Sequence, residues 1–136
     1  MKFAYKELPG DDGDFLRPVV PVRLAGQESV LHACLIDSGA LHNRFPLWAA
    51  EAAGVPLDDG LESRIAIGGV ITRAITMPVD LQIMDAHWHA GVSFCDPWPF
   101  GFGVLGQEGF FRFFETTFRA SQYAFELQPD AGPPYP

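Results

Sequence analysis

The sequence predicts an all-β protein, a small and mostly antiparallel barrel with two short helices. Most of the chain alternates apolar and polar residues with a period of two, which is typical of strands that bury one face. The composition includes 14 glycines and 12 prolines, which interrupt helices and favour many short strands joined by turns. With 136 residues, 48% of them hydrophobic, the chain is long enough for one core but not for two.

The strands can be assigned in order along the chain. Residues 17–24 and 29–36 are expected to form a hairpin around Ala25, Gly26 and Gln27. The second of these strands is apolar on both faces near its end, which predicts a central, buried position. Later segments with the same alternation are expected to be strands at residues 64–67, 79–83, 118–120 and 123–127.

Two segments break the alternation and predict short helices. Residues 46–53 begin with Pro46 and are followed by Gly54, the usual signals for a helix start and a helix end. Residues 107–114 follow Gly106 and contain four phenylalanines that we expect in the core. At the ends of the chain, we expect a flexible arm over residues 1–14 and an extended, proline-rich tail over residues 129–136. Residues 15–128 then form one domain.

Charge and cysteine content narrow the classes of function. A formal net charge of −8 disfavours binding to nucleic acid or to anionic membranes. No apolar run approaches the length of a membrane span, and the N-terminus has no apolar segment of the kind that signal peptides contain. Cys34 and Cys95 belong to no CxxC pair, so we expect reduced thiols and a cytoplasmic protein, with a Cys34–Cys95 disulfide left as an alternative.

The clearest functional signal is the run Leu35-Ile36-Asp37-Ser38-Gly39-Ala40. A strand buried on both faces leads directly into the carboxylate of Asp37, and burying an unpaired charge is costly. Ser38 can donate a hydrogen bond, and Gly39 lets the backbone turn closely behind the carboxylate. A second apolar segment that ends in glycine, Val104-Leu105-Gly106, leads into the second predicted helix.

Residues 37–40 resemble the D-[ST]-G-A signature of retropepsin-like aspartic proteases, and the run through Asn43 is similar to their bacterial and retrotransposon-type members. Residues 104–111 resemble the second motif of the family, and the helix at 46–54 and the hairpin at 118–127 also fit. The resemblance covers residues 15–128 and implies a small closed barrel of the retropepsin type with one or two short helices. Leu41 and Gln107 stand where the family usually has polar or charged residues; both charges are absent together, so neither leaves an orphan buried charge.

The resemblance implies an aspartic peptidase that hydrolyses peptide bonds with two carboxylates. One carboxylate takes a proton from water, and the other is protonated and polarises the carbonyl; about 3 Å apart, the two share one proton. Because this chain has a single motif, the second Asp37 must come from a second copy, so the resemblance implies a homodimer with Asp37 on its two-fold axis. Ser38 and Gly39 would hold the carboxylate. Neither a metal nor an organic cofactor is implied, and the partners are a second copy and a peptide or protein substrate.

The same resemblance implies a set of residues that bind substrate. Residues 64–76 would form a flap over the cleft, with Gly68 and Gly69 at its tip, and a two-residue Gly-Gly turn between β-branched arms is itself a hairpin signal. Phe102 and Val104 would line the cleft and favour apolar side chains. Ala40, next to the catalytic turn, completes the set.

Two readings of Asp37 compete with the enzyme. The carboxylate can cap nearby backbone N–H groups in an Asx turn, which is a purely structural role. The chain can also be a catalytically weak or inactive module on the same fold that dimerises or binds peptides. Residues 101–106 spell GxGxxG, but a dinucleotide site needs a βαβ unit around that motif, and the pattern here is antiparallel.

Other catalytic sites have weaker support in the sequence. His87 and His89 lie on the same face of an expected strand, with Asp85 in the same register, but no further ligand completes a metal site. Neither Ser38 nor Cys34 has a nearby base, and no GxSxG motif is present, which disfavours a serine or cysteine hydrolase.

Overall fold

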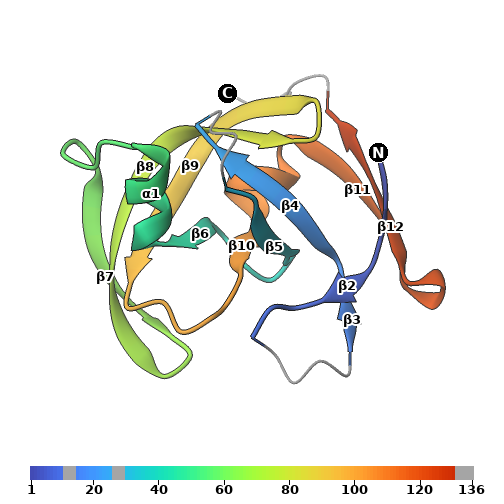
Figure 1. Cartoon of the computed structure of the whole chain (residues 1–136), viewed down its shortest axis with the longest axis horizontal. Coiled ribbons are helices and arrows are strands. Elements are labelled where there is room, and N and C mark those ends of the chain that lie inside the picture. Colours follow the sequence, from blue (N-terminus) through green and yellow to red (C-terminus); the bar gives the residue numbers. More distant parts are fainter. Residues whose placement is uncertain (11–14, 26–29, 131–136) are drawn as a thin grey trace.

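A computed structural model of the chain describes residues 1–10, 15–25 and 30–130 (Figure 1). Strands account for 57% of it, which confirms the all-β class predicted from the alternating pattern. Its elements are, in chain order, β1 (Lys2–Ala4), β2 (Lys6–Glu7), β3 (Leu16–Arg17), β4 (Val19–Leu24), β5 (His32–Ile36), β6 (Asn43–Pro46), α1 (Leu47–Ala53), β7 (Leu61–Ile67), β8 (Val70–Ile83), β9 (Ala86–Asp96), β10 (Gly103–Leu105), the π-helical turn η1 (Gln107–Phe111), β11 (Phe114–Arg119), the 3₁₀ turn η2 (Ala120–Gln122) and β12 (Ala124–Pro129).

The central feature is a closed barrel of six strands, with a seventh strand outside it. The strand order is β4-β5-β10-β6-β9-β8, and pairing of β8 with β4 closes the ring, while β7 lies on the outer edge of β8. Neighbouring strands are antiparallel except for β5 with β10 and β6 with β9, which run parallel. Closure leaves β5 in the interior of the sheet, as the apolar pattern near its end predicted.

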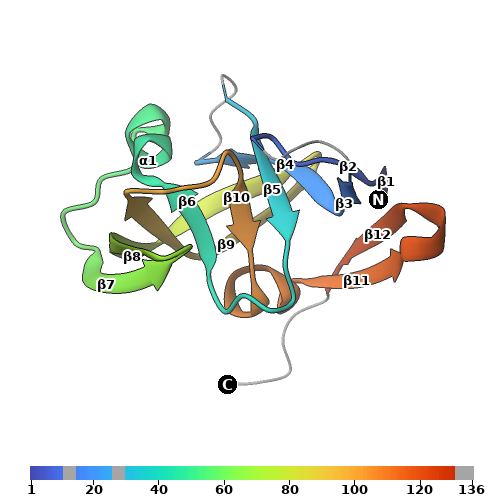
Figure 2. The same ribbon diagram turned by 90° about the horizontal axis from the view of Figure 1, so that it is seen from below.

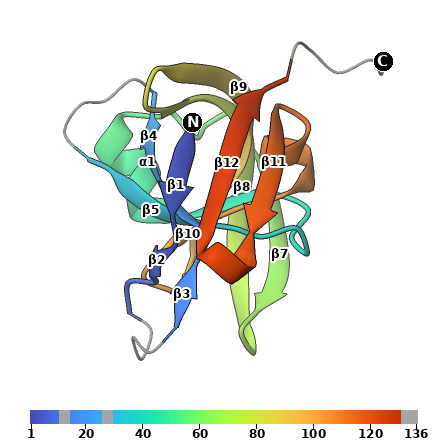
Figure 3. The ribbon, with the colours of Figure 1, turned by 90° about the vertical axis from the view of Figure 1, so that its right-hand side faces the viewer.

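A second sheet, in the order β1-β12-β11, stands beside the barrel (Figure 3). The flexible arm expected over residues 1–14 is wrong for residues 2–7, because Lys2–Ala4 pair with β12 and Lys6–Glu7 pair with β3. Phe3 stacks on Phe125 with 5.1 Å between ring centroids, and the N-terminal ammonium donates to the Leu127 carbonyl at 2.7 Å. The strand forms because it packs the partly buried Phe3 against Phe125 and pairs with the backbone of β12 along one edge.

Parts of three predicted segments lie outside the described residues. These are positions 11–14 of the expected arm, positions 26, 27 and 29 of the expected hairpin, and positions 131–136 of the expected tail. The hairpin itself is confirmed, since β4 and β5 pair antiparallel with Val20 opposite Cys34. In the tail, β12 ends at Pro129.

Both predicted helices are present, and the second is shorter than expected. Pro46 caps the start of α1, and Gly54 ends it in the left-handed conformation, at a φ of 68°, as the sequence signals indicated. The second segment makes a single π-helical turn and ends at Phe111, so Phe114 already belongs to strand β11. Phe110 and Phe114 stack within the core, where both are buried. No helix in the ranges described above is long or apolar enough to cross a membrane.

Candidate functional site

The two glycine-containing motifs meet at one end of the barrel. Strands β5 and β10 run side by side in the same direction, with Val104 opposite Leu35 (Figure 2). β5 ends at Ile36, and the backbone N–H of Asp37 continues the ladder by donating to the Leu105 carbonyl at 3.0 Å. The parallel register therefore brings the loop after β5 against the turn after β10.

Asp37 begins a tight turn. Its carbonyl accepts from the Ala40 N–H at 3.1 Å, and its Oδ1 accepts from the Gly39 N–H at 2.9 Å. A β-carbon on Gly39 would lie 3.2 Å from that Oδ1, so glycine lets the backbone pass close to the carboxylate. Asp37 and Ala40 are half-buried, while Ser38 and Gly39 are exposed. The N–H of Gly39 thus holds one carboxylate oxygen.

The carboxylate of Asp37 is not committed to any charged partner within the described part of the chain. The ion pairs there join other residues, and Oδ2 of Asp37 makes no hydrogen bond to these residues. An ion pair with a residue of the same chain, which would contradict a catalytic role, is therefore not found among the described residues. The Gly39 contact is the Asx-type bond that the structural reading expects, so this bond does not separate the two readings.

The turn that follows β10 is bonded to the Asp37 loop through backbone and side chain. The N–H groups of Gln107 and Glu108 donate to the carbonyls of Ala40 and Leu41, both at 2.9 Å. The side-chain amide of Gln107 donates to the Ser38 carbonyl at 2.7 Å. The side chain of Gln107 thus holds the loop that carries the candidate carboxylate.

Asn43 links the same two segments from inside, and the sequence analysis gave it no role of its own. Its side chain is fully buried; Oδ1 accepts from the Gly106 N–H at 3.1 Å, and Nδ2 donates to the Gly109 carbonyl at 2.9 Å. Trp88 Nε1 donates to the same carbonyl at 2.8 Å. The available signal was a polar amide at the start of a strand whose next apolar residue, Phe45, is in the core.

Close packing explains the glycine at position 106. A β-carbon there would lie 2.7 Å from the Ala40 carbonyl oxygen and 2.9 Å from that of His42, and both are backbone atoms that cannot swing away. The glycine of the Val104-Leu105-Gly106 segment is therefore required by the crossing of the two loops. The sequence indicated the segment but not the reason for its last residue.

The predicted substrate-binding residues fall into two groups. Val104 lies on β10 opposite Leu35 of β5, the strand that leads to Asp37, and Phe102 lies in the bend just before β10. Gly68 and Gly69 both have positive φ and form a two-residue turn. Ile67 and Val70, on either side of it, pair with each other, which confirms the hairpin of β7 and β8.

The tip of that hairpin lies against the loop that enters β10. A β-carbon on Gly68 would lie 3.4 Å from the Pro99 ring and 3.5 Å from the Phe100 ring. No hydrogen bond or ion pair of the described residues joins the tip to Asp37. The structure thus brings Asp37, Ala40 and Val104 into one region, and it brings Gly68 to the loop before Phe102.

The described residues form neither a metal site nor a reactive thiol. Among the described residues, no group of three or more His, Cys, Asp or Glu side chains lies close enough to hold a metal ion; His89 instead contacts Asp80 at 2.7 Å. Cys34 and Cys95 are both free and buried, and burial raises the pKa of each thiol, which opposes thiolate formation. For Cys95, the nearby Arg44 offsets part of that shift in pKa.

Comparison with protein-family models found no match, and comparison with curated proteins found none either.

Proposed function

We propose that the chain is one protomer of a homodimeric aspartic peptidase of the retropepsin type. The observation that carries the proposal is Asp37, a half-buried carboxylate at the end of a central barrel strand, held on one oxygen and without an ion pair among the described residues. The resemblance of residues 37–43 and 104–111 to the two family motifs supports it, because the fold brings these segments into direct contact.

The proposed mechanism requires a second carboxylate close to the first. Each chain supplies one Asp37, so a two-fold axis beside this residue would pair two copies, and the two groups would share one proton. The ionised member takes a proton from water as the water attacks the peptide carbonyl, and the protonated member donates a hydrogen bond to the carbonyl oxygen. Neither Leu41, which is 54% exposed, nor Gln107 adds a competing charge.

The surface around β11 supports self-association. Among the described residues, β11 is an edge strand of its sheet, with β12 on one side only, and Phe118 on it is 42% exposed. A long unpaired edge with an exposed aromatic residue is a common site for pairing with another chain. Residues of the hairpin around Gly68 would cover a bound peptide, and Val104 with Phe102 would contact its apolar side chains.

The test of catalysis compares the parent protein with Asp37→Asn and with Asp85→Asn as a matched control. Asp85 is exposed at the β8–β9 turn, so the control makes the same chemical change away from the site. We expect the parent and the control to cleave a mixed peptide library between acidic and neutral pH, and Asp37→Asn to lose cleavage. Asn can keep the bond from Gly39, so the loss would be chemical rather than structural. Equal cleavage by Asp37→Asn, or no cleavage by any of the three, contradicts the peptidase.

Sedimentation at micromolar concentration tests the assembly separately. A lone protomer holds half of the proposed site, so the parent should sediment at about twice the chain mass of 14.9 kDa. A stable monomer would contradict the dimer. A dimer that binds peptides without cleaving them would instead favour the non-catalytic module with the same fold.

A further inference from the structure

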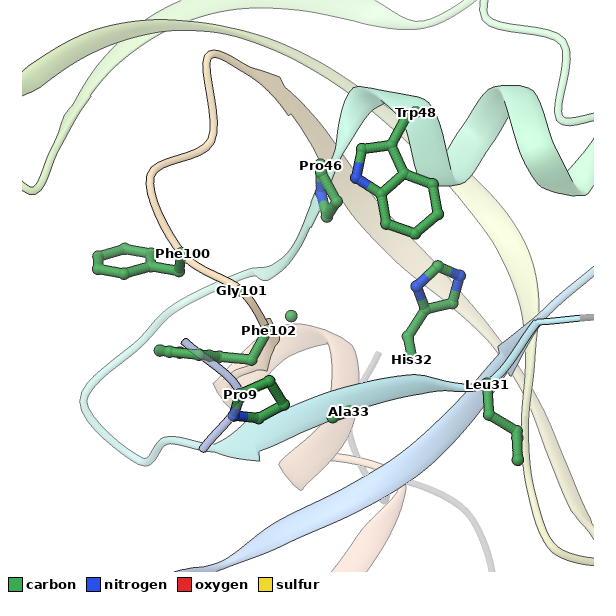
Figure 4. Close-up of a pocket in the computed structure, with 10 residues that line it drawn as sticks. Pro9, Leu31, His32, Ala33, Pro46, Trp48, Phe100, Gly101 and Phe102 are labelled. Carbon is green, nitrogen blue, oxygen red and sulfur yellow. The ribbon is translucent and has the colours of Figure 1, made fainter. Parts of the chain in front are cut away.

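A cavity of about 260 Å³ opens at the start of β5 and β10, away from Asp37 (Figure 4). His32 and Asp37 are five positions apart on an extended chain, which corresponds to about 16 Å. In Figure 4, His32 and Trp48 lie on one side of the cavity, and Phe100 and Phe102 lie on the other. The residues that line it are Pro9, Leu31, His32, Ala33, Pro46, Trp48, Phe100, Gly101, Phe102 and Gly103.

The imidazole of His32 has no polar partner within the described residues. The residue is only 8% exposed, and its ring contacts Phe45 edge-on and Trp48 at an angle, with centroid distances of 5.4 Å and 5.3 Å. Neither ring nitrogen makes a hydrogen bond to any residue of the ranges described. A buried polar group normally has a hydrogen-bond partner. The ring nitrogens of His32 are not among the buried atoms without a partner, so they are open to the cavity, where water or the polar group of a ligand can bond to them.

The walls of the cavity are flat and apolar. Phe100 and Phe102 stack with 5.3 Å between ring centroids and an interplanar angle of 26°, and Trp48 is 54% exposed. The backbone closes one end, because Gly101 passes so near Pro9 that a β-carbon on it would lie 2.7 Å from the Pro9 carbonyl oxygen. Flat aromatic walls favour an aromatic ring, which can stack or meet them edge-on.

The charges around the cavity favour a neutral ligand. None of the described residues that line it is an acid, a lysine or an arginine, so neither a cation nor an anion finds an opposite charge. Burial lowers the pKa of His32, which keeps its imidazole neutral near pH 7. A neutral imidazole has one nitrogen that donates and one that accepts, and a hydroxyl group can pair with either.

We propose that this aromatic cavity binds a phenol, a neutral aromatic ring whose hydroxyl group hydrogen-bonds to His32, either as a tyrosine side chain of a peptide or as a free small molecule. The ring lies between Trp48 and Phe102. Asp37 does not line the cavity, which shares only Phe102 with the residues proposed to bind the peptidase substrate, so the proposal does not depend on peptidase activity.

The experiment titrates the full chain with p-cresol, N-acetyl-tyrosinamide and N-acetyl-phenylalaninamide. Binding is followed by the ring ¹⁵N shifts of the histidines and by tryptophan fluorescence. We expect p-cresol to shift His32 and to leave the exposed His87 and His89 unchanged. His32→Phe removes the hydrogen bond and should weaken p-cresol binding about five- to tenfold. His87→Phe is the matched control and should bind as the parent does.

The probes distinguish the two sources of the phenol. Binding of p-cresol and the tyrosine amide, with weaker binding of the phenylalanine amide, supports a tyrosine side chain; binding of p-cresol alone supports a free phenol. If the ring ¹⁵N shifts of His32 do not change up to the solubility limit of p-cresol, the proposal is wrong. This measurement uses the parent protein and needs no variant. Equal p-cresol affinity of folded His32→Phe also overturns it. Asp37→Asn should bind p-cresol as the parent does, whatever its effect on cleavage.

Discussion

Replacing Asn43 by leucine tests whether this buried amide holds the two loops together. Leucine has a similar size but cannot bond to Gly106 or Gly109. The Gly106 N–H would then be left buried without its acceptor, which costs about 1–3 kcal/mol, and the lost bond to the Gly109 carbonyl adds about 0.5–1.5 kcal/mol. That carbonyl keeps its bond from Trp88 Nε1. We therefore expect the free energy of unfolding to fall by about 1.5–4.5 kcal/mol.

Urea unfolding of four proteins measures this and tests the shared acceptor. They are the parent, Asn43→Leu, Trp88→Phe and the double variant. Each single variant leaves the Gly109 carbonyl with one donor, and only the double variant removes both. The double variant should therefore lose about 1–2 kcal/mol more than the sum of the single losses. A loss below about 0.5 kcal/mol for Asn43→Leu would refute the reasoning, because substitutions at unimportant surface positions cost that little. Strictly additive losses would refute the shared acceptor, because independent sites add.

Three further predictions follow from burial and close contact. Gly106→Ala should destabilise the protein clearly more than Gly91→Ala in urea unfolding, because a β-carbon meets backbone oxygens at the first position and has open space at the second. Cys34 and Cys95 should resist alkylation in the native protein at pH 8 and react once urea unfolds it; rapid native labelling would contradict their burial. Burial lowers the pKa of His32 below its ordinary 6.5. As the pH falls, the imidazole is therefore protonated in the unfolded state before it is protonated in the folded state. Stability should therefore fall as the pH drops below 6.5 towards the pKa of the folded state, and His32→Phe should show a smaller fall between pH 7.5 and 5.

The parts of the fold that the sequence predicted are those that local chemistry decides. Two adjacent glycines between β-branched arms permit the positive φ angles that a two-residue hairpin turn needs, and the structure has 55° at Gly68 and 79° at Gly69. Pro46 and Gly54 bound a helix for equally local reasons. The continuous apolar run before Asp37 predicted a strand with neighbours on both sides, which β4 and β10 provide.

The parts that could not be predicted depend on contacts between distant segments. Strand β1 has only three residues, and it is stable because β12, more than a hundred positions later, offers Phe125 to Phe3. The second sequence motif indicated a helix, but not that Gly106 must lie against the carbonyls of the first motif. Likewise, nothing in a lone histidine at position 32 indicated that Phe102, in the bend before β10, would face it across a cavity.

Asn43 also offers a way to separate positioning from stability at the proposed site. A shared proton requires two carboxylates about 3 Å apart, so a small displacement of either Asp37 loop would disturb the pair. Asn43 does not reach the carboxylate; it acts through Gly106, which contacts the loop that Asp37 begins. If the chain is a peptidase, Asn43→Leu, measured where it is fully folded and dimeric, should lower kcat more than it changes KM. It should also move the acidic limb of the pH profile, because the coupling between the two carboxylates changes with their separation. Unchanged kcat and an unchanged pH profile, together with lower stability, would mean that Asn43 supports the fold without positioning Asp37.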